Sequence, residues 1–245
     1  MKEYTFCINA DQIIDSVPDG EKLRITCSED KQILSVEADR TDTHPLNTTE
    51  YRELTNKMRT FLDEHEFILY IHGFASRFKP ESNKVKNLSK IFPVIGPDLD
   101  YTNHHDVIKD TLAWMSITLD IALVTGTSLG GYWAARNGSD CGIPFVAMNP
   151  AINPSKTLQK YIGDGISYNG EPYHLDKNIP GEYEEFSTDG CGLILIDKGD
   201  DLLEPAQTIN KLTSHYNVIT FDGGSHRFEH IEDALEDIRR FHWNS

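Results

Sequence analysis

The chain has 245 residues, of which 38% are hydrophobic and 25% charged, and its formal net charge is −16 at pH 7. This composition is typical of a folded globular protein, and the length suits one large α/β domain, residues 1–245. The negative charge argues against nucleic acid or an anionic membrane surface as a partner. No apolar run approaches the roughly 20 residues of a membrane span, and residues 1–6 lack a secretory apolar segment, so we expect a cytoplasmic protein.

The four cysteines are scattered, with no Cys-x-x-Cys pair and no histidine nearby at ligand spacing. They are Cys7, Cys27, Cys141 and Cys191. This distribution argues against a zinc site and against a disulfide framework. We therefore expect reduced, mostly buried thiols and no metal.

Residues 1–40 alternate apolar and polar side chains, with turn-forming sequences at 18–20 and 28–30. This period of two predicts an antiparallel meander at one edge of a sheet. A polar linker over 40–49 comes next, followed by apolar residues at helical spacing from Tyr51 onward. Residues 1–65 are thus expected to form an extension made of a β-meander and a helix.

Residues 67–71 form a continuous apolar run, which is typical of a strand buried on both faces of a parallel sheet. His72, Gly73 and Phe74 follow it directly. In hydrolases that carry their serine on a strand-turn-helix, a His-Gly loop after an earlier strand supplies one oxyanion-binding N–H group. Phe74 N–H is our candidate donor, and we expect His72 to hold the loop by hydrogen bonds rather than to transfer protons.

Two polar clusters near this loop are open to functional interpretation. The basic residues Arg77, Lys79, Lys84 and Lys86 would suit an anion such as a phosphate-bearing leaving group, but solvated surface charge is the alternative we favour. The run 104–106, His-His-Asp, opens a predicted helix after a short strand near 93–95. Because adjacent side chains point apart, we interpret this run as a solvated helix start and not as a metal site.

The segment 126–130, Gly-Thr-Ser-Leu-Gly, lies between an apolar run at 121–124 and a helix-compatible sequence. A strand that turns sharply into a helix at such a sequence holds its serine, here Ser128, in a strained conformation with the hydroxyl exposed. Gly126 and Gly130 leave room where the two backbones pass closely. Leu129 N–H at the helix start is the second candidate oxyanion donor.

The remaining chain alternates strands and helices, which predicts a parallel, doubly wound sheet. Strands are expected at 145–148, 192–196 and 217–221, and the last helix places Ile231, Leu235, Ile238 and Phe241 on one face. The segment 163–190, rich in glycine, proline and tyrosine, interrupts this alternation. We expect either a partial lid over a pocket or a surface excursion that only covers the core.

The ends of three predicted parallel strands carry a serine, an acidic cluster and a histidine, which is the chain order of α/β-hydrolases. His226 would take the proton of Ser128, and a carboxylate would hold the imidazole. Asp201 is the first choice for that carboxylate, because it directly precedes an apolar pair with a proline soon after. Asp200 is the second choice, and Asp197 is expected at the strand end. His230, about one helical turn beyond His226, is the other histidine with which the assignment of His226 is compared.

Several stretches together resemble the YqiA/YcfP-like esterase family of the α/β-hydrolases, over about residues 66–245. They are 70–74, 126–132, 148–151, 199–203 and 223–226. The resemblance implies a cofactor-free esterase or thioesterase, with Ser128, His226 and one of the pair Asp200 and Asp201 at the triad positions. Residues 1–65 precede the usual start of the family core, and the family's acidic stretch often reads Asp-Glu where this chain has Asp-Asp.

The sequence therefore predicts an α/β-hydrolase fold, a mostly parallel doubly wound sheet with an N-terminal antiparallel β extension. The first functional hypothesis is a serine hydrolase that cleaves acyl esters or thioesters, with no cofactor and a small-molecule substrate. An amidase or carbon-carbon bond hydrolase would use the same residues. The alternative from another class is a catalytically silent hydrolase fold that serves as a binding or scaffolding module.

Overall fold

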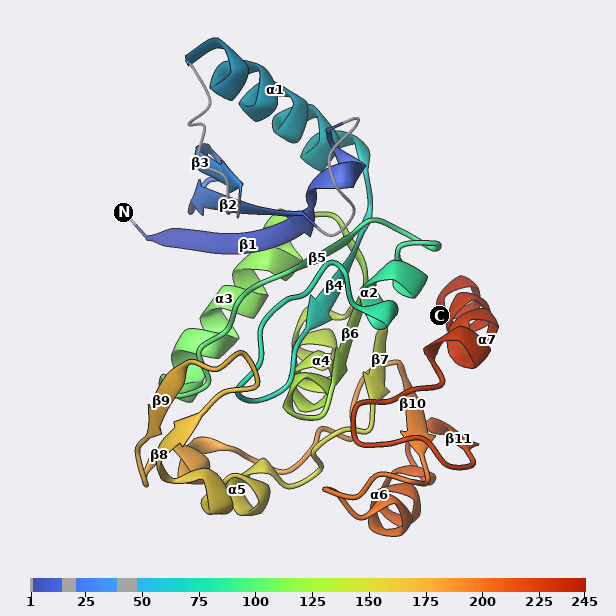
Figure 1. Ribbon diagram of the computed structural model, residues 1–245. Helices are drawn as coiled ribbons and strands as arrows, with labels where there is room; N and C mark the ends of the chain where they lie inside the picture. The colour runs from blue at the N-terminus through green and yellow to red at the C-terminus, as the bar shows by residue number, and fades with distance from the viewer. Residues whose placement is uncertain (1, 15–20, 39–47) are drawn as a thin grey trace.

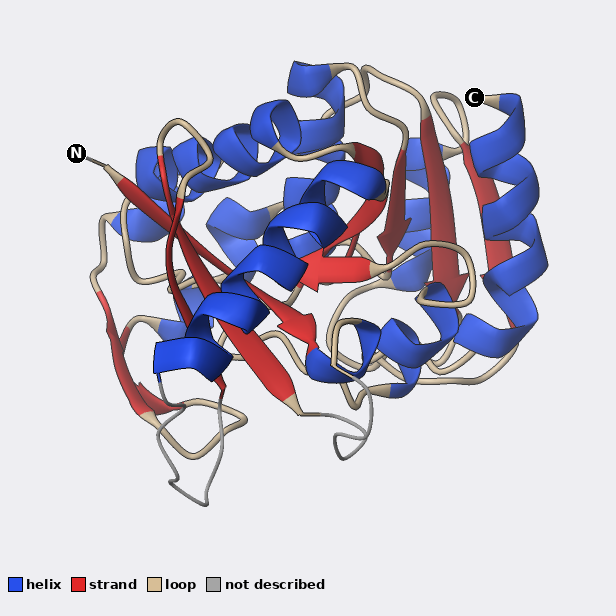
Figure 2. Ribbon diagram, turned by 90° about the horizontal axis from the view of Figure 1, so that it is seen from above, coloured by secondary structure: helices blue, strands red, loops and turns tan. Residues whose placement is uncertain are grey.

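The computed structural model describes residues 2–14, 21–38 and 48–245. The turn expected at 18–20 lies outside these residues, as does the expected linker up to residue 47. Within the described part, a large twisted sheet runs through the molecule with helices packed on both of its faces (Figure 1 and Figure 2).

The large sheet has the strand order β11-β10-β7-β6-β4-β5-β1-β2-β3. The strands are β1 (Glu3–Asn9), β2 (Lys22–Ser28), β3 (Ile33–Ala38), β4 (Phe67–Ile71), β5 (Val94–Gly96), β6 (Ile121–Thr127), β7 (Phe145–Met148), β10 (Gly192–Asp197) and β11 (Asn217–Phe221). The six strands from β11 to β5 are parallel, whereas β1, β2 and β3 are antiparallel to their neighbours. This is the α/β-hydrolase architecture that the sequence predicted.

The central parallel strands are mostly apolar and do not alternate, because both faces of the sheet are covered. Every residue of β4 and β7 is buried, and so are Leu193 to Asp197 of β10. A strand with one solvated face would instead alternate apolar and polar residues. The carboxyl ends of these strands meet at one edge of the sheet, where the loops after β4, β6, β10 and β11 come together.

The helices divide between two cores, one on each face of the sheet. They are α1 (Thr48–Glu64), α2 (Asn83–Leu88), α3 (His105–Thr118), α4 (Leu129–Cys141), α5 (Pro154–Thr157), α6 (Pro205–Leu212) and α7 (Ile231–Asn244). Buried side chains of α1, α3, α4 and α6 join the larger core. Those of α2 and α7 join the smaller core on the opposite face.

The N-terminal extension continues the large sheet. β1 pairs with β5 through Cys7 and Ile8, and β2 and β3 follow in antiparallel register. α1 packs Leu54, Met58 and Leu62 against this end of the larger core. In Figure 1 the extension, in blue, forms the top of the molecule above the parallel strands. The meander expected at a sheet edge is confirmed, with β1 covering the edge that β5 would otherwise expose.

The segment 163–190 contains a two-stranded hairpin, followed by a stretch of chain that packs side chains into the core. β8 (Gly163–Ile166) pairs antiparallel with β9 (Pro172–Leu175), and the hairpin stands apart from the large sheet (Figure 1). Tyr168 N–H at its tip donates to the Ala75 carbonyl at 2.9 Å. The end of β9 and the stretch after it, which includes a short 3-10 helix over Ile179–Glu182, bury side chains in the larger core: Leu175, Ile179, Tyr183 and Phe186. This segment therefore both covers the core and contacts the loop after β4.

Candidate active site

Ser128 lies in the sharp turn between β6 and α4. Its backbone has φ 59° and ψ −120°, a conformation that costs free energy for any residue with a side chain. The turn is possible because Gly130 and Gly126 have no Cβ atom. A Cβ atom at Gly130 would collide with the Ile71 carbonyl oxygen, and one at Gly126 with the Gly130 carbonyl oxygen. The Ser128 carbonyl accepts hydrogen bonds from Gly131 N–H and Ala151 N–H, both at 3.0 Å. Hydrogen bonds from the helix that follows Ser128 and from the segment after β7 thus hold the strained serine.

His226 reaches Ser128 from the loop that follows β11. Its Nε2 lies 2.9 Å from Ser128 Oγ, and its side chain is 18% exposed. Its Nδ1 lies 2.9 Å from one carboxylate oxygen of Asp200 and 3.0 Å from the other. With Nδ1–H donating to the carboxylate, the Nε2 lone pair faces the serine hydroxyl and can accept its proton.

The carboxylate partner of His226 is Asp200, so our first choice of Asp201 for this position is wrong. The Asp200 carboxylate also accepts hydrogen bonds from Leu202 N–H at 2.8 Å and Leu203 N–H at 2.9 Å. These bonds fold the Asp200 side chain over its own turn and into the site, where it is 2% exposed. The next residue of such a turn points away, and Asp201 is exposed to solvent.

The hydrogen bonds to Asp200 keep its carboxylate ionised. Burial opposes ionisation, but the bond from His226 and the bonds from Leu203 and Leu202 N–H together lower the pKa of Asp200 below its usual value. A carboxylate that stays ionised can stabilise a positive charge on the imidazole of His226. Ser128, His226 and Asp200 therefore form a continuous hydrogen-bonded chain.

A second acid-histidine pair positions the loop that carries His226. Asp197 is fully buried at the end of β10, and His230 Nδ1 lies 2.7 Å from its Oδ1. The other oxygen of Asp197 accepts hydrogen bonds from Glu229 N–H at 2.7 Å and Ser225 N–H at 3.3 Å. This pairing raises the pKa of His230. His230 thus pairs with Asp197, and it is His226 that contacts Ser128.

Asn149, which we did not assign a role from the sequence, links three strand ends. It follows β7 with φ 40°, and its Oδ1 accepts a hydrogen bond from Asp197 N–H at 2.8 Å. Its Nδ2 donates to the Ser225 carbonyl at 2.9 Å and lies 3.3 Å from the His226 carbonyl. A buried asparagine directly after a strand, in the run 148–151 that resembles the esterase family, was the available signal.

The loop after β4 passes directly beside Ser128. A Cβ atom built on Gly73 would lie 3.4 Å from Ser128 Cβ and 3.9 Å from Ser128 Oγ. Leu129 is the first residue of α4, and the N–H groups of a helix's first turn have no acceptor within the helix. The two backbone segments that carry our candidate oxyanion donors, Phe74 and Leu129, thus both adjoin Ser128.

His72 holds this loop in place, as expected. It is buried, its Nδ1 bonds to the Gly73 carbonyl at 2.8 Å, and its Nε2 accepts the Leu99 N–H at 2.9 Å. The Tyr101 hydroxyl donates to the His72 carbonyl at 2.5 Å. Burial lowers the pKa of His72 to about 4, so the ring is neutral at pH 7. Both ring nitrogens are occupied by the backbone, which leaves none for proton transfer.

The polar clusters noted near the loop have separate partners. Arg77 lies 3.9 Å from a Glu171 carboxylate oxygen, whereas Lys84 donates to the Arg227 carbonyl at 2.5 Å. Of the histidine pair at the start of α3, His104 is exposed and contacts Glu182, as a solvated helix start should. His105 is instead buried beside Trp133, with ring centroids 4.4 Å apart. The expectation of a solvated side chain is therefore wrong for His105.

Sequence comparison places the chain in a family. The sequence profile of UPF0227, described as an uncharacterised protein family, matches residues 67–243. The chain is a member of the UPF0227 family. UPF0227 protein YcfP of Escherichia coli is 29% identical over 180 residues, covering 71% of this chain and 97% of YcfP. A UPF0227 protein of Vibrio parahaemolyticus is 28% identical over 195 residues, covering 71% of this chain and 98% of that protein. The UPF0227 match thus begins where the N-terminal extension ends.

Structure comparison shows the fold. Est1E from Butyrivibrio proteoclasticus superposes with a TM-score of 0.57 at 15% identity, covering 74% of this chain and 88% of Est1E. The esterase domain of a Rhodothermus marinus protein superposes with a TM-score of 0.52 at 15% identity, covering 96% of this chain and 94% of that domain. This UPF0227 member therefore has the α/β-hydrolase fold. Among its described helices, none is long and apolar enough to cross a membrane.

Proposed function

We propose that the chain is a serine hydrolase that cleaves carboxylic esters or thioesters through an acyl-enzyme on Ser128. The observation that carries the proposal is the position of His226, within hydrogen-bond reach of both Ser128 Oγ and the Asp200 carboxylate. A serine hydroxyl is a weak nucleophile at neutral pH and needs such a base. The strained backbone of Ser128 and the buried, ionised Asp200 also support the assignment.

In the proposed reaction, Ser128 Oγ attacks the acyl carbonyl carbon while its proton passes to His226 Nε2. The carbonyl oxygen becomes an oxyanion, which we assign to the N–H groups of Phe74 and Leu129. The intermediate then collapses, the bond to the leaving oxygen or sulfur breaks, and His226 returns the proton to it. Water activated by His226 repeats the sequence on the acyl-enzyme, releasing the acid and restoring Ser128.

An ester substrate is the form of this proposal that the structural relatives favour. Est1E has been solved with ferulic acid bound, with a TM-score of 0.52 to this chain, and a monoacylglycerol lipase from Paleococcus ferrophilus has a TM-score of 0.51. We assign the hairpin β8–β9 a second role as a partial lid, because it contacts the loop that carries Phe74. The amidase, the carbon-carbon bond hydrolase and the silent scaffold are the competing functions.

The proposal is tested with a fluorophosphonate probe, read by intact mass, and with hydrolysis of p-nitrophenyl butyrate. We expect one adduct on the wild type and none on Ser128→Ala. His226→Ala should react far more slowly, and Asp201→Asn is the matched control that should react as the wild type does. Undiminished ester hydrolysis by Ser128→Ala would disprove the assignment. A wild type that neither labels nor hydrolyses esters or amides would favour the scaffold.

A further inference from the structure

A cavity of about 590 Å³ lies beside the candidate active site. Four segments line it: the loop 74–77 after β4, the loop 98–102 after β5, residues 167–174 of the β8–β9 hairpin, and Arg24 on β2. Its volume falls within the range of small-molecule sites, roughly 300–1,000 Å³. The hairpin contributes one wall, and the N-terminal extension contributes Arg24.

The cavity is connected to the proposed chemistry through Phe74. Phe74 lines the cavity, and its backbone N–H is our candidate oxyanion donor. The preceding residue, Gly73, is the one that adjoins Ser128. The Tyr173 ring of the hairpin contacts the Phe74 ring edge to face, with centroids 5.3 Å apart. The cavity is therefore adjacent to the loop that adjoins Ser128.

The lining is mixed and not uniformly apolar, as an acyl chain would require. Alkyl groups gain free energy only where they leave water for apolar surface. Here charged and hydrogen-bonding side chains line the cavity at many positions, among them Arg24, Arg77, Asp98, Asp100, Asn169 and Glu171. The cavity thus fits the alcohol half of an ester better than the acid half.

The charges in the lining also disfavour an anionic ligand. The guanidinium of Arg24 lies 3.1 Å from the Asp98 carboxylate, and that of Arg77 lies 3.9 Å from the Glu171 carboxylate. Asp100 adds a third carboxylate on a protein whose net charge is already −16. A phosphate or carboxylate would meet these acids at close range, whereas neutral hydroxyls can donate to carboxylates and accept from guanidiniums.

One polar atom of the lining has no partner among the described residues. The Oδ1 atom of Asn169 is buried and accepts no hydrogen bond there, which is a costly state for a polar atom. Because this atom has almost no accessible surface, a ligand hydroxyl could satisfy it only once the hairpin tip moves aside. The aromatic rings of Phe74, Tyr101 and Tyr173 offer flat apolar surface for the C–H face of a sugar ring.

We propose that this cavity binds the alcohol half of the substrate and that this alcohol is neutral and polyhydroxylated, of the size of a sugar. The inference rests on the proposed function, since it names the substrate class of the same site. Asn169 and Arg77 are the residues assigned to the hydroxyl groups. The hairpin that carries Asn169 then selects the substrate as well as covering the site.

The test compares three butyryl compounds: the esters 6-O-butyrylglucose and propyl butyrate, and the thioester butyryl coenzyme A. We expect kcat/KM of the wild type to be at least tenfold higher for the sugar ester than for the propyl ester, because hydrogen bonds from two side chains, each worth several-fold, add together. In Asn169→Leu and Arg77→Ala this ratio should fall several-fold. The control Arg240→Ala, on the exposed face of α7, should keep the wild-type ratio.

Two outcomes would overturn the inference while leaving the hydrolase intact. One is equal kcat/KM for the sugar and propyl esters, and the other is preference for the anionic coenzyme A thioester. If no ester is hydrolysed, the proposed function fails, and a binding measurement then tests the cavity assignment by itself. Methyl glucoside should then still give saturation-transfer NMR signals with Ser128→Ala that Asn169→Leu weakens, and their absence would overturn the cavity assignment too.

Discussion

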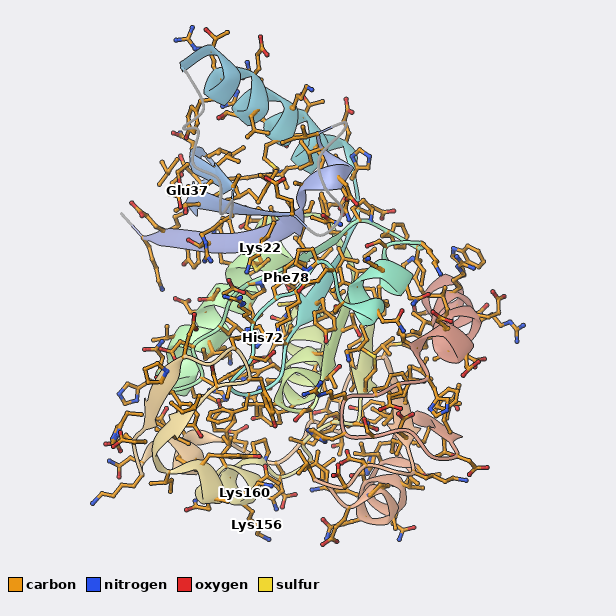
Figure 3. The ribbon with its side chains drawn as sticks, viewed as in Figure 1. Lys22, Glu37, His72, Phe78, Lys156 and Lys160 are labelled. Atoms are coloured by element: carbon orange, nitrogen blue, oxygen red, sulfur yellow. The ribbon has the colours of Figure 1, made fainter. Side chains whose placement is uncertain are left out.

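Lys22 of the N-terminal extension forms an ion pair with Asp98 of the main body, with 2.5 Å between Nζ and Oδ2. The two side chains are only 7% and 19% exposed. The other oxygen of Asp98 accepts Phe78 N–H at 2.8 Å, and Lys22 Nζ also donates to the Phe78 carbonyl at 3.2 Å. Figure 3 shows Lys22 beside Phe78, on the side of the molecule where His72 holds the same loop. This pair ties β2 to the segment that follows Phe74.

Lys22→Met should destabilise the protein by about 2 kcal/mol, because the largely buried Asp98 carboxylate loses a charged hydrogen-bond partner and keeps only Arg24 as a cationic neighbour. Urea unfolding measures the loss. Lys31→Met is the matched control: Lys31 pairs with Asp63, whose side chain is 58% exposed, so the expected cost is under about 1 kcal/mol. Wild-type unfolding should be one transition, because we expect residues 1–245 to fold as a single domain. Equal losses of stability in the two variants would contradict the role given to the Lys22–Asp98 pair. Separate unfolding transitions would contradict the single domain.

Asp200→Asn should lower kcat for p-nitrophenyl butyrate by about ten-thousand-fold, because an amide cannot hold the imidazole tautomer or stabilise its charge. The Asp200 side chain would keep its bonds from Leu202 and Leu203 N–H, so stability should change little. Asp201→Asn changes the same chemistry one residue away, at an exposed position, and should leave kcat within about twofold. A larger loss in Asp201→Asn would reverse the assignment.

The sequence predicted the strand-turn-helix around Ser128 and the position of His226 because both depend on local signals. A buried strand, a small-x-Ser-x-small turn and a following helix are contiguous in the chain. The choice between Asp200 and Asp201 was not local in that way. It depends on how one turn folds its carboxylate over Leu202 and Leu203 N–H, and two adjacent aspartates look alike in a sequence.

Two other ties between distant segments could not be predicted. Lys22 and Asp98 are 76 positions apart, and each alone reads as an ordinary surface charge. Asn149 bonds to the carbonyl of Ser225, also 76 positions away. Such pairs follow from the strand order, which places β1 beside β5 and β7 beside β10. Periodicity predicts the strands but not their neighbours.

Gly130→Ala should destabilise the protein by about 1–3 kcal/mol and abolish probe labelling of Ser128. The new methyl group would collide with the Ile71 carbonyl oxygen, and backbone cannot move aside as a flexible side chain can. Gly181→Ala is the matched control, because a Cβ atom there meets nothing within 4 Å. Thermal unfolding and fluorophosphonate labelling are measured for both. Normal labelling of Gly130→Ala would mean that the β6–α4 turn is not as close to β4 as described.

His72 should make the protein less stable as the pH falls below 6.5. Its pKa in the folded protein is lowered to about 4 by burial, whereas in the unfolded chain it is near 6.5. Between these values the unfolded chain binds the proton and the folded protein does not, so the contribution is fully present above pH 6.5 and is lost as the pH falls toward 4. The difference of roughly 2.5 pKa units corresponds to about 3 kcal/mol.

The measurement is the free energy of unfolding by urea at pH 5 and pH 8, for the wild type and His72→Gln. Glutamine keeps a donor and an acceptor but does not titrate in this range, so the variant should lose less stability between pH 8 and pH 5 than the wild type does. Any cost of fitting glutamine into the loop appears equally at both pH values and cancels in that difference. Parallel pH profiles for the two proteins would show that His72 is protonated in the folded state as readily as in the unfolded chain.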